Sequence, residues 1–182
     1  MGKRSGSGSG SRGGASAGTA PAGTVSLGTV TFNGKETELT GKTLTKWQSG
    51  DRAQLEIEIS AQGILGGRAF GSVVFNVNAG DKTAKIVSIN SIQALRGQGV
   101  GERLYGAAFS AAKQRGVTTF TSDSRVSIPA ANTWRRIGKK LGGVTESKSS
   151  NDGQQLIGQG GKPVFSINLG RVSQSKLDGL GK

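Results

Sequence analysis

The segment with the clearest chemical meaning is a glycine-rich hexapeptide near the middle of the 182-residue chain. It runs Arg96, Gly97, Gln98, Gly99, Val100 and Gly101. Its glycines let the backbone turn sharply, and the apolar periodicity that follows predicts a helix that begins at this turn. The first amide groups of a helix lack internal partners and carry the positive end of its dipole, so such a turn binds phosphate oxygens. Because the Arg96 guanidinium adds a charged donor, the segment predicts an anion-binding turn.

Spacing and composition exclude several other kinds of site. The turn lacks the Gly-Lys-Ser/Thr of a Walker A loop, and Glu102 stands where the Gly-x-Gly-x-x-Gly pattern needs its last glycine. The chain has no Cys and no His, which excludes disulfides, Cys/His zinc sites and Ser-His-Asp catalysis. No apolar run approaches the roughly 20 residues of a membrane helix, and the first residues lack the apolar core of a secretory signal. We therefore expect a soluble protein with no metal site and no membrane contact.

Strands and helices must alternate around this turn to position it. The pattern predicts strands at residues 25–32, 35–39, 53–61, 68–78, 84–92, 117–122, 154–158 and 164–169. It predicts helices over 99–115 and over 127–141, the second capped by Ser127. The polar stretch 42–50 is open between a short helix and no regular structure. This order indicates an α/β domain with a mixed sheet.

Charge and low-complexity composition divide the chain into three parts. Residues 1–24 are a Gly/Ser-rich basic segment, 25–170 the folded domain and 171–182 a polar C-terminal tail. The chain carries a formal net charge of +13. We expect residues 1–24 to form a flexible arm, which is either a solvated tail or a segment that binds nucleic acid or a neighbouring subunit.

The turn and its surroundings resemble the GNAT family of acetyl-CoA-dependent N-acetyltransferases. Residues 96–101 match its R/Q-x-x-G-x-G/A motif, and Ala130 and Gly138 match its later N-x-x-A-x-x-x-Y-x-x-x-G pattern. The resemblance covers about residues 53–169 and implies a mostly antiparallel mixed sheet with flanking helices, splayed between the family's fourth and fifth strands. It implies that the pantetheine of acetyl-CoA lies in that gap, paired with the backbone around Ile92. The diphosphate would then lie on the amides of residues 97–101.

The catalytic residues stay unassigned. The family's acidic tyrosine corresponds to Trp134, whose indole N–H is too weak an acid for that role, and Trp134 is better explained as a core aromatic on the apolar stripe of its helix. The acids Glu56, Glu58 and Asp123 are candidate bases that would act through water, or simply solvated surface groups. Tyr105 is a candidate acid or a packing residue.

Three functions remain open. The first is acyl transfer from acetyl-CoA to an unknown amine by a cytoplasmic enzyme. The second is a non-catalytic structural or interaction subunit of a larger assembly, for example a phage virion protein, whose arm contacts neighbours or DNA. The third is a nucleic-acid-binding protein, because residues 95–143 carry nine Lys or Arg and two acidic residues. The charge cluster has three interpretations: its cations bind a CoA phosphate, bind nucleic acid, or form a solvent-exposed surface.

Overall fold

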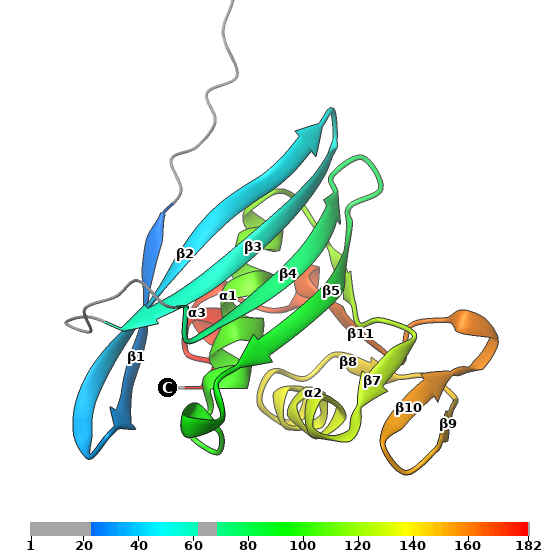
Figure 1. The fold of residues 1–182 in the computed structure, drawn as a ribbon. Coiled ribbons are helices and arrows are strands. Elements are labelled where there is room, and N and C mark those ends of the chain that lie inside the picture. The colour runs from blue at the N-terminus through cyan, green and yellow to red at the C-terminus, as the bar shows by residue number, and fades with distance from the viewer. Residues whose placement is uncertain (1–22, 62–68, 182) are drawn as a thin grey trace, which may run out of the picture.

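The computed structural model describes residues 23–61 and 69–181, which fold as a mixed α/β domain (Figure 1). Eight strands form one sheet in the order β1-β2-β3-β4-β5-β6-β11-β8, and a smaller sheet has the order β7-β10-β9. All neighbouring strands pair in antiparallel fashion except β5 and β6, which are parallel. The fold class is therefore the predicted one. Most of the expected basic arm, residues 1–22, lies outside the described residues, as does the start of the predicted 68–78 strand.

The first hairpin joins β1 (Thr24–Phe32) to β2 (Lys35–Ser49) through Asn33 and Gly34. Both turn residues have positive φ, 50° and 75°, as a type I′ turn requires. The hairpin prediction is confirmed at the turn, but β2 is much longer than 35–39. The stretch 42–50 holds no helix, because its backbone to Ser49 is paired with β3.

Strands β3 (Arg52–Ala61), β4 (Gly71–Asn78) and β5 (Thr83–Ser91) form the predicted meander. The alternation along β3 is confirmed, since its apolar side chains are buried and its polar ones are partly exposed. Leu55 and Ile59 are fully buried, and β3 contacts α1. This face of the sheet supplies one wall of the hydrophobic core.

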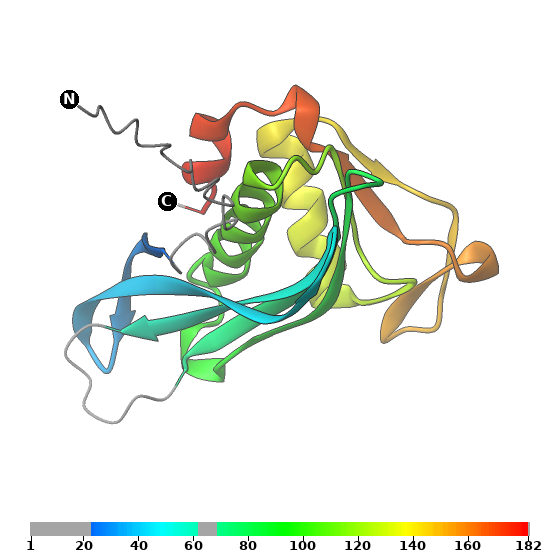
Figure 2. The ribbon, with the colours of Figure 1, turned by 90° about the horizontal axis from the view of Figure 1, so that it is seen from above.

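Two helices lie on one face of the sheet (Figure 2). Helix α1 (Val100–Gln114) follows the glycine turn, and α2 (Ile128–Leu141) is capped by Ser127, whose Oγ accepts a hydrogen bond from the Ala130 N–H at 3.4 Å. Between them, β6 (Thr119–Thr121) carries the chain back beside β5. The helices close the core and place their first turns at the same end of the domain.

The remaining elements are short. They are β7 (Arg125–Ser127), β8 (Val144–Glu146), β9 (Ser149–Asn151), β10 (Gln155–Gly158), β11 (Phe165–Asn168) and α3 (Gln174–Asp178), with 3-10 turns η1 (Gln93–Leu95), η2 (Gln159–Gly161) and η3 (Leu169–Arg171). Within the segment expected as a polar tail, 171–182, α3 packs on α1, and both Leu177 of α3 and Leu180 just after it are buried. The approach is close, because a Cβ added at Gly106 of α1 would lie 2.9 Å from the Leu177 carbonyl oxygen.

Candidate functional site

A free strand edge lies beside the glycine turn. Strand β5 pairs with β6 only over Thr83–Lys85, and on that side residues 86–91 have no strand partner within the described chain. A bulge at Val87 bends β5 along the same stretch, since Ile86 pairs with Phe75 and Ser88 with Val74. The sheet therefore opens towards the end of β5, as the predicted splay requires, and leaves backbone groups available to a ligand.

The glycine turn has the backbone geometry that the sequence predicts. Gly97 and Gly99 have positive φ, 79° and 75°, and Gly99 is the N-cap of α1. A Cβ at Gly97 would meet no atom within 4 Å, so the turn is open on that side. The turn that leads into α1 is therefore open to a ligand at Gly97.

A cleft of about 800 Å³ joins the turn, the end of β5 and the first turn of α2. Of the seven predicted binding residues, five line it: Arg96, Gly97, Gly99, Val100 and Gly101. Ile92 does not, and its backbone is already used, because its N–H donates to Phe70 and its carbonyl accepts from Leu95. The cleft is lined instead by the free edge of β5 at Ile89, Asn90 and Ser91.

Gln98 also points away from the cleft. Its side chain pairs with the backbone of Thr31 on β1 and so ties the turn to the first hairpin. Arg103, on the first turn of α1, donates to the carbonyl oxygens of Leu27, Thr29 and Gly181 at 2.9, 2.8 and 2.6 Å. These contacts tie the turn and the start of α1 to segments near both ends of the described sequence. No sequence signal predicted them, because the partners are far apart along the chain.

A buried carboxylate lies directly after the turn. Glu102 has a side chain only 5% exposed, and its two oxygens bind Arg136 Nε at 2.7 Å and Lys140 Nζ at 2.5 Å. Burial alone would raise the pKa of this carboxyl, but the hydrogen bonds from Lys140 and Arg136 outweigh it and hold the pKa below its usual value. Glu102 is therefore ionised at neutral pH, and the cluster keeps one net positive charge.

Comparison with known proteins identifies the fold and its family. The acetyltransferase (GNAT) family model matches residues 40–138, which is more than half of the chain. The chain belongs to the GNAT acetyltransferase family. No curated protein matches it significantly.

Solved structures share the GNAT fold at low sequence identity. A protein from Agrobacterium tumefaciens assigned as an acetyltransferase has a TM-score of 0.51 and 21% identity, over 65% of this chain and 76% of that one. An acetyltransferase from Bacillus cereus has a TM-score of 0.50 and 16% identity, over 68% and 80% of the two chains. A ribosomal-protein alanine N-acetyltransferase from Escherichia coli has a TM-score of 0.48 and 16% identity, over 67% and 72%. At these identities the similarity concerns the fold alone.

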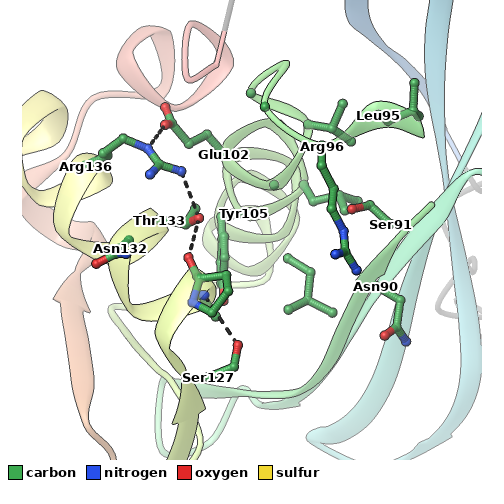
Figure 3. A pocket seen from close by; sticks show the side chains of 18 of the residues that line it. Asn90, Ser91, Leu95, Arg96, Glu102, Tyr105, Ser127, Asn132, Thr133 and Arg136 are labelled. Carbon is green, nitrogen blue, oxygen red and sulfur yellow. Dashed lines mark hydrogen bonds and ion pairs between the residues drawn. The ribbon is translucent and has the colours of Figure 1, made fainter. Parts of the chain in front are cut away.

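In this GNAT domain the two aromatic candidates lie side by side. Trp134 is fully buried, stacks on Phe165 at 5.6 Å and lies 5.1 Å from the ring of Tyr105. Its Nε1 has no hydrogen-bond partner of normal geometry among the described residues. Trp134 is thus a core residue. Tyr105 is also nearly buried, at 2% exposed, but unlike Trp134 it belongs to the cleft lining, on α1 (Figure 3). Burial raises the pKa of Tyr105 to about 12, although the neighbouring indole favours its ionised form.

The three candidate bases of the sequence analysis lie outside the cleft lining of the GNAT domain. Glu56 pairs with Lys46 at 2.9 Å on the polar side of β3, where Glu58 also lies. Asp123 pairs with Lys85 at 3.0 Å. Burial opposes its ionisation, but the hydrogen bonds from Lys85 and Ser124 keep the pKa of Asp123 below its usual value. Among the described lining residues, the cleft carboxylate is Glu102.

Many cations of residues 95–143 are already engaged within the domain. Arg103 donates to backbone carbonyls, and Lys113 donates to the Val172 carbonyl. Arg135 donates to the Glu146 carboxylate from Nε at 3.0 Å and from Nη2 at 2.6 Å. Arg96, by contrast, makes no side-chain hydrogen bond with a described residue and projects into the cleft (Figure 3). No group of acidic side chains within 23–61 and 69–181 could hold a metal ion. None of the helices in these ranges is long and apolar enough to cross a membrane.

Proposed function

We propose that this protein transfers an acetyl group from acetyl-CoA to the nitrogen of an amine. The observation that carries the proposal is the junction of the free β5 edge with the positive-φ glycine turn, in one cleft of about 800 Å³. Such a cleft is large enough for an extended thioester ligand. Membership of the GNAT family supports acyl-CoA as the donor, and the acceptor amine stays unassigned.

The lining residues match the chemical parts of acetyl-CoA. Backbone groups at Ile89–Ser91 would pair with the amides of the pantetheine arm as an added strand does. The amides that follow Gly97 and the Arg96 guanidinium would hold the diphosphate. Gly97 supports this fit, because a side chain there would project into space that a diphosphate needs.

Acetyl-CoA supplies an activated carbonyl carbon, which the amine nitrogen attacks with formation of a C–N bond and release of the thiolate. We infer that the hydroxyl of Tyr105 donates a hydrogen bond to the departing sulfur. Tyr105 is the single tyrosine of the chain, it lines the cleft, and burial keeps it protonated with a pKa of about 12. It therefore stabilises developing negative charge as a neutral donor.

The acceptor must lose a proton without help from a free carboxylate in the described lining, because Glu102 is engaged by two cations. We infer that the amine binds in its neutral form and that the proton leaves through water. The rate should therefore rise with pH up to the pKa of the acceptor amine, with no bell shape from a cleft carboxylate.

Thermal melting with acetyl-CoA tests the donor site. A ligand at 100 times its dissociation constant should add roughly 2.7 kcal/mol to the free energy of unfolding. Gly97→Glu should abolish the shift, because its side chain would project into the open space beside the turn that the diphosphate needs. Gly116→Glu is the matched control: Gly116 has a similar positive φ of 81° and lies at the opposite end of α1. Absence of any shift with acetyl-CoA or CoA would refute the proposal.

Thiol release across a panel of amines tests the chemistry. Tyr105→Phe should lower kcat about 10-fold to 100-fold and leave KM for acetyl-CoA nearly unchanged, because it removes a donor used in the transition state. A melting shift without thiol release from any amine would instead describe a binding module that lacks catalysis.

A further inference from the structure

The Arg136 guanidinium is held in place by hydrogen bonds that leave one of its nitrogens without a partner among the described residues. Its Nε binds Glu102 at 2.7 Å and its Nη2 donates to Thr133 Oγ1 at 3.0 Å. The Thr133 hydroxyl donates in turn to the Pro129 carbonyl at 3.1 Å, so its lone pair is available to the arginine. Nη1 of Arg136 has no hydrogen-bond partner within the described chain. Two of three nitrogens therefore fix the group, and one stays available.

The position of Arg136 makes that free nitrogen relevant to a ligand. Arg136 lines the cleft, and its side chain is 53% exposed although its partner Glu102 is buried. Arg96 and Arg136 come from opposite sides of the same pocket, one from the turn and one from α2 (Figure 3). Two guanidinium groups that face one space form a strong site for phosphate oxygens.

The charge of the cluster favours an anion despite the buried carboxylate. Glu102 takes one hydrogen bond from Arg136 and one from Lys140, so one negative charge is shared between two positive charges. Lys140 is not part of the cleft lining. The positive charge of Lys140 neutralises the negative charge of Glu102 from outside the cleft lining. The positive charge of Arg136 therefore remains to attract an anion in the cleft.

The neighbouring Arg135 shows what a purely structural arginine looks like on the same helix. Arg135 gives Nε and Nη2 to Glu146 at 3.0 and 2.6 Å, and Nη1 to Asn132 at 3.4 Å. All three nitrogens are engaged, and Arg135 does not line the cleft. The contrast between adjacent arginines separates a role in ligand binding from a role in holding α2.

We propose that Arg136 binds a phosphate group of the nucleotide part of CoA, and that Glu102 is a positioning residue that holds the guanidinium at the cleft. This inference rests on the proposed function for its ligand. It assigns a binding role to α2, in addition to the glycine turn and Arg96.

Titration calorimetry of the full chain with CoA, dephospho-CoA and pantetheine tests the proposal. Arg136→Gln should weaken CoA binding about 10-fold to 100-fold, the range for a charged hydrogen bond, and leave pantetheine binding unchanged. Arg135→Gln should match wild type with all three ligands. Loss confined to CoA would locate the contact at its 3′-phosphate, and equal loss with CoA and dephospho-CoA would locate it at the diphosphate. Either result supports the proposal.

Glu102→Gln separates positioning from simple electrostatics. Removal of a negative charge beside a phosphate site should tighten CoA binding if charge alone matters. Loss of the group that orients Arg136 should weaken it, and we expect CoA to bind about 3-fold to 10-fold more weakly. Melting of the ligand-free variant checks the fold, which we expect to persist because both freed cations can reach water. Tighter CoA binding by this variant would overturn the positioning role.

The outcomes for the two proposals can be told apart. Wild-type binding of CoA with no change in Arg136→Gln would overturn this inference and leave the proposed function intact. Equal weakening of CoA and pantetheine by Arg136→Gln would also overturn it, because the effect would then be one on the shape of the cleft. Failure of the wild-type chain to bind CoA at all would overturn both.

Discussion

Both amide atoms of the Gln98 side chain are hydrogen-bonded to the backbone of Thr31, 67 positions earlier in the chain. The Thr31 N–H donates to Oε1 at 2.7 Å, and Nε2 donates to the Thr31 carbonyl at 2.9 Å. The side-chain amide thus makes the pair of hydrogen bonds that a neighbouring strand would make at the free edge of β1. This contact makes the first hairpin a support for the glycine turn, although the hairpin lies outside the cleft lining.

We expect Gln98→Ala to loosen the turn. It removes the two hydrogen bonds to Thr31 and the longer one from Nε2 to the Ala94 carbonyl oxygen at 3.3 Å, so the free energy of unfolding should fall by about 1–2 kcal/mol. Amide hydrogen exchange should speed up at Thr31 and at residues 97–101. Gln93→Ala is the control, because Gln93 is exposed in η1 and its side chain has no partner among the described residues. Unchanged exchange at the turn in Gln98→Ala would show that the hairpin does not support it.

Two glycines of α1 should respond in opposite ways to alanine. A Cβ at Gly101 would lie 3.8 Å from Thr133, an ordinary contact, so Gly101→Ala should raise stability by up to about 1 kcal/mol. A Cβ at Gly106 would lie 2.9 Å from the Leu177 carbonyl and 3.1 Å from Leu180. Gly106→Ala should therefore lower stability by about 1–3 kcal/mol. Urea unfolding of the two variants measures both signs, and a stabilising Gly106→Ala would contradict the observed packing of α3.

The single tyrosine can be titrated directly by its ultraviolet absorbance. The phenolate of Tyr105 should appear with a midpoint near pH 12 in the folded chain, compared with about pH 10 in denaturant. Since the folded pKa is raised, this group stabilises the fold below pH 10, and the contribution is lost as pH rises towards 12. Tyr105→Phe should abolish the absorbance step. A midpoint of about 10 in the folded chain would show that the hydroxyl is not shielded from water.

The Glu102 carboxylate should make the free energy of unfolding depend on pH in the acidic range. Its pKa is lowered in the folded chain, so it stabilises the fold above the unfolded pKa of about 4.3, and this contribution is lost as pH falls through the folded pKa. Wild type should exceed Glu102→Gln by about 1–3 kcal/mol at pH 7. Denaturant unfolding from pH 7 down to pH 3 should show the two proteins converging. A constant difference over that range would contradict an ionised, ion-paired Glu102.

Local chemistry made part of this fold predictable. Asn33 and Gly34 identify the first turn because both adopt positive φ, and the alternation along 53–61 identifies the buried face of β3 because successive side chains point to opposite faces. Ser127 marks the start of α2 through its hydrogen bond to the Ala130 amide. In each case the signal and the structure lie within a few residues, so no distant partner was needed.

Long-range pairing decided the rest. The polar stretch 42–50, which the sequence left open, continues β2 as far as Ser49 because β3 supplies its hydrogen bonds. The sequence near the C-terminus is mostly polar, but Leu177 and Leu180 are buried there. They pack against α1 at Gly106, where the absence of a side chain allows the close approach.

The site divides along the same line. The amino-acid order by itself determined the glycine turn and the helix that begins there, because backbone conformation and helix capping are local properties. Only the tertiary structure decided that Arg136 and Lys140, 34 and 38 positions away, converge on Glu102, and that Tyr105 rather than Trp134 reaches the cleft. Side chains so distant in sequence meet only when packed helices and strand register bring them together.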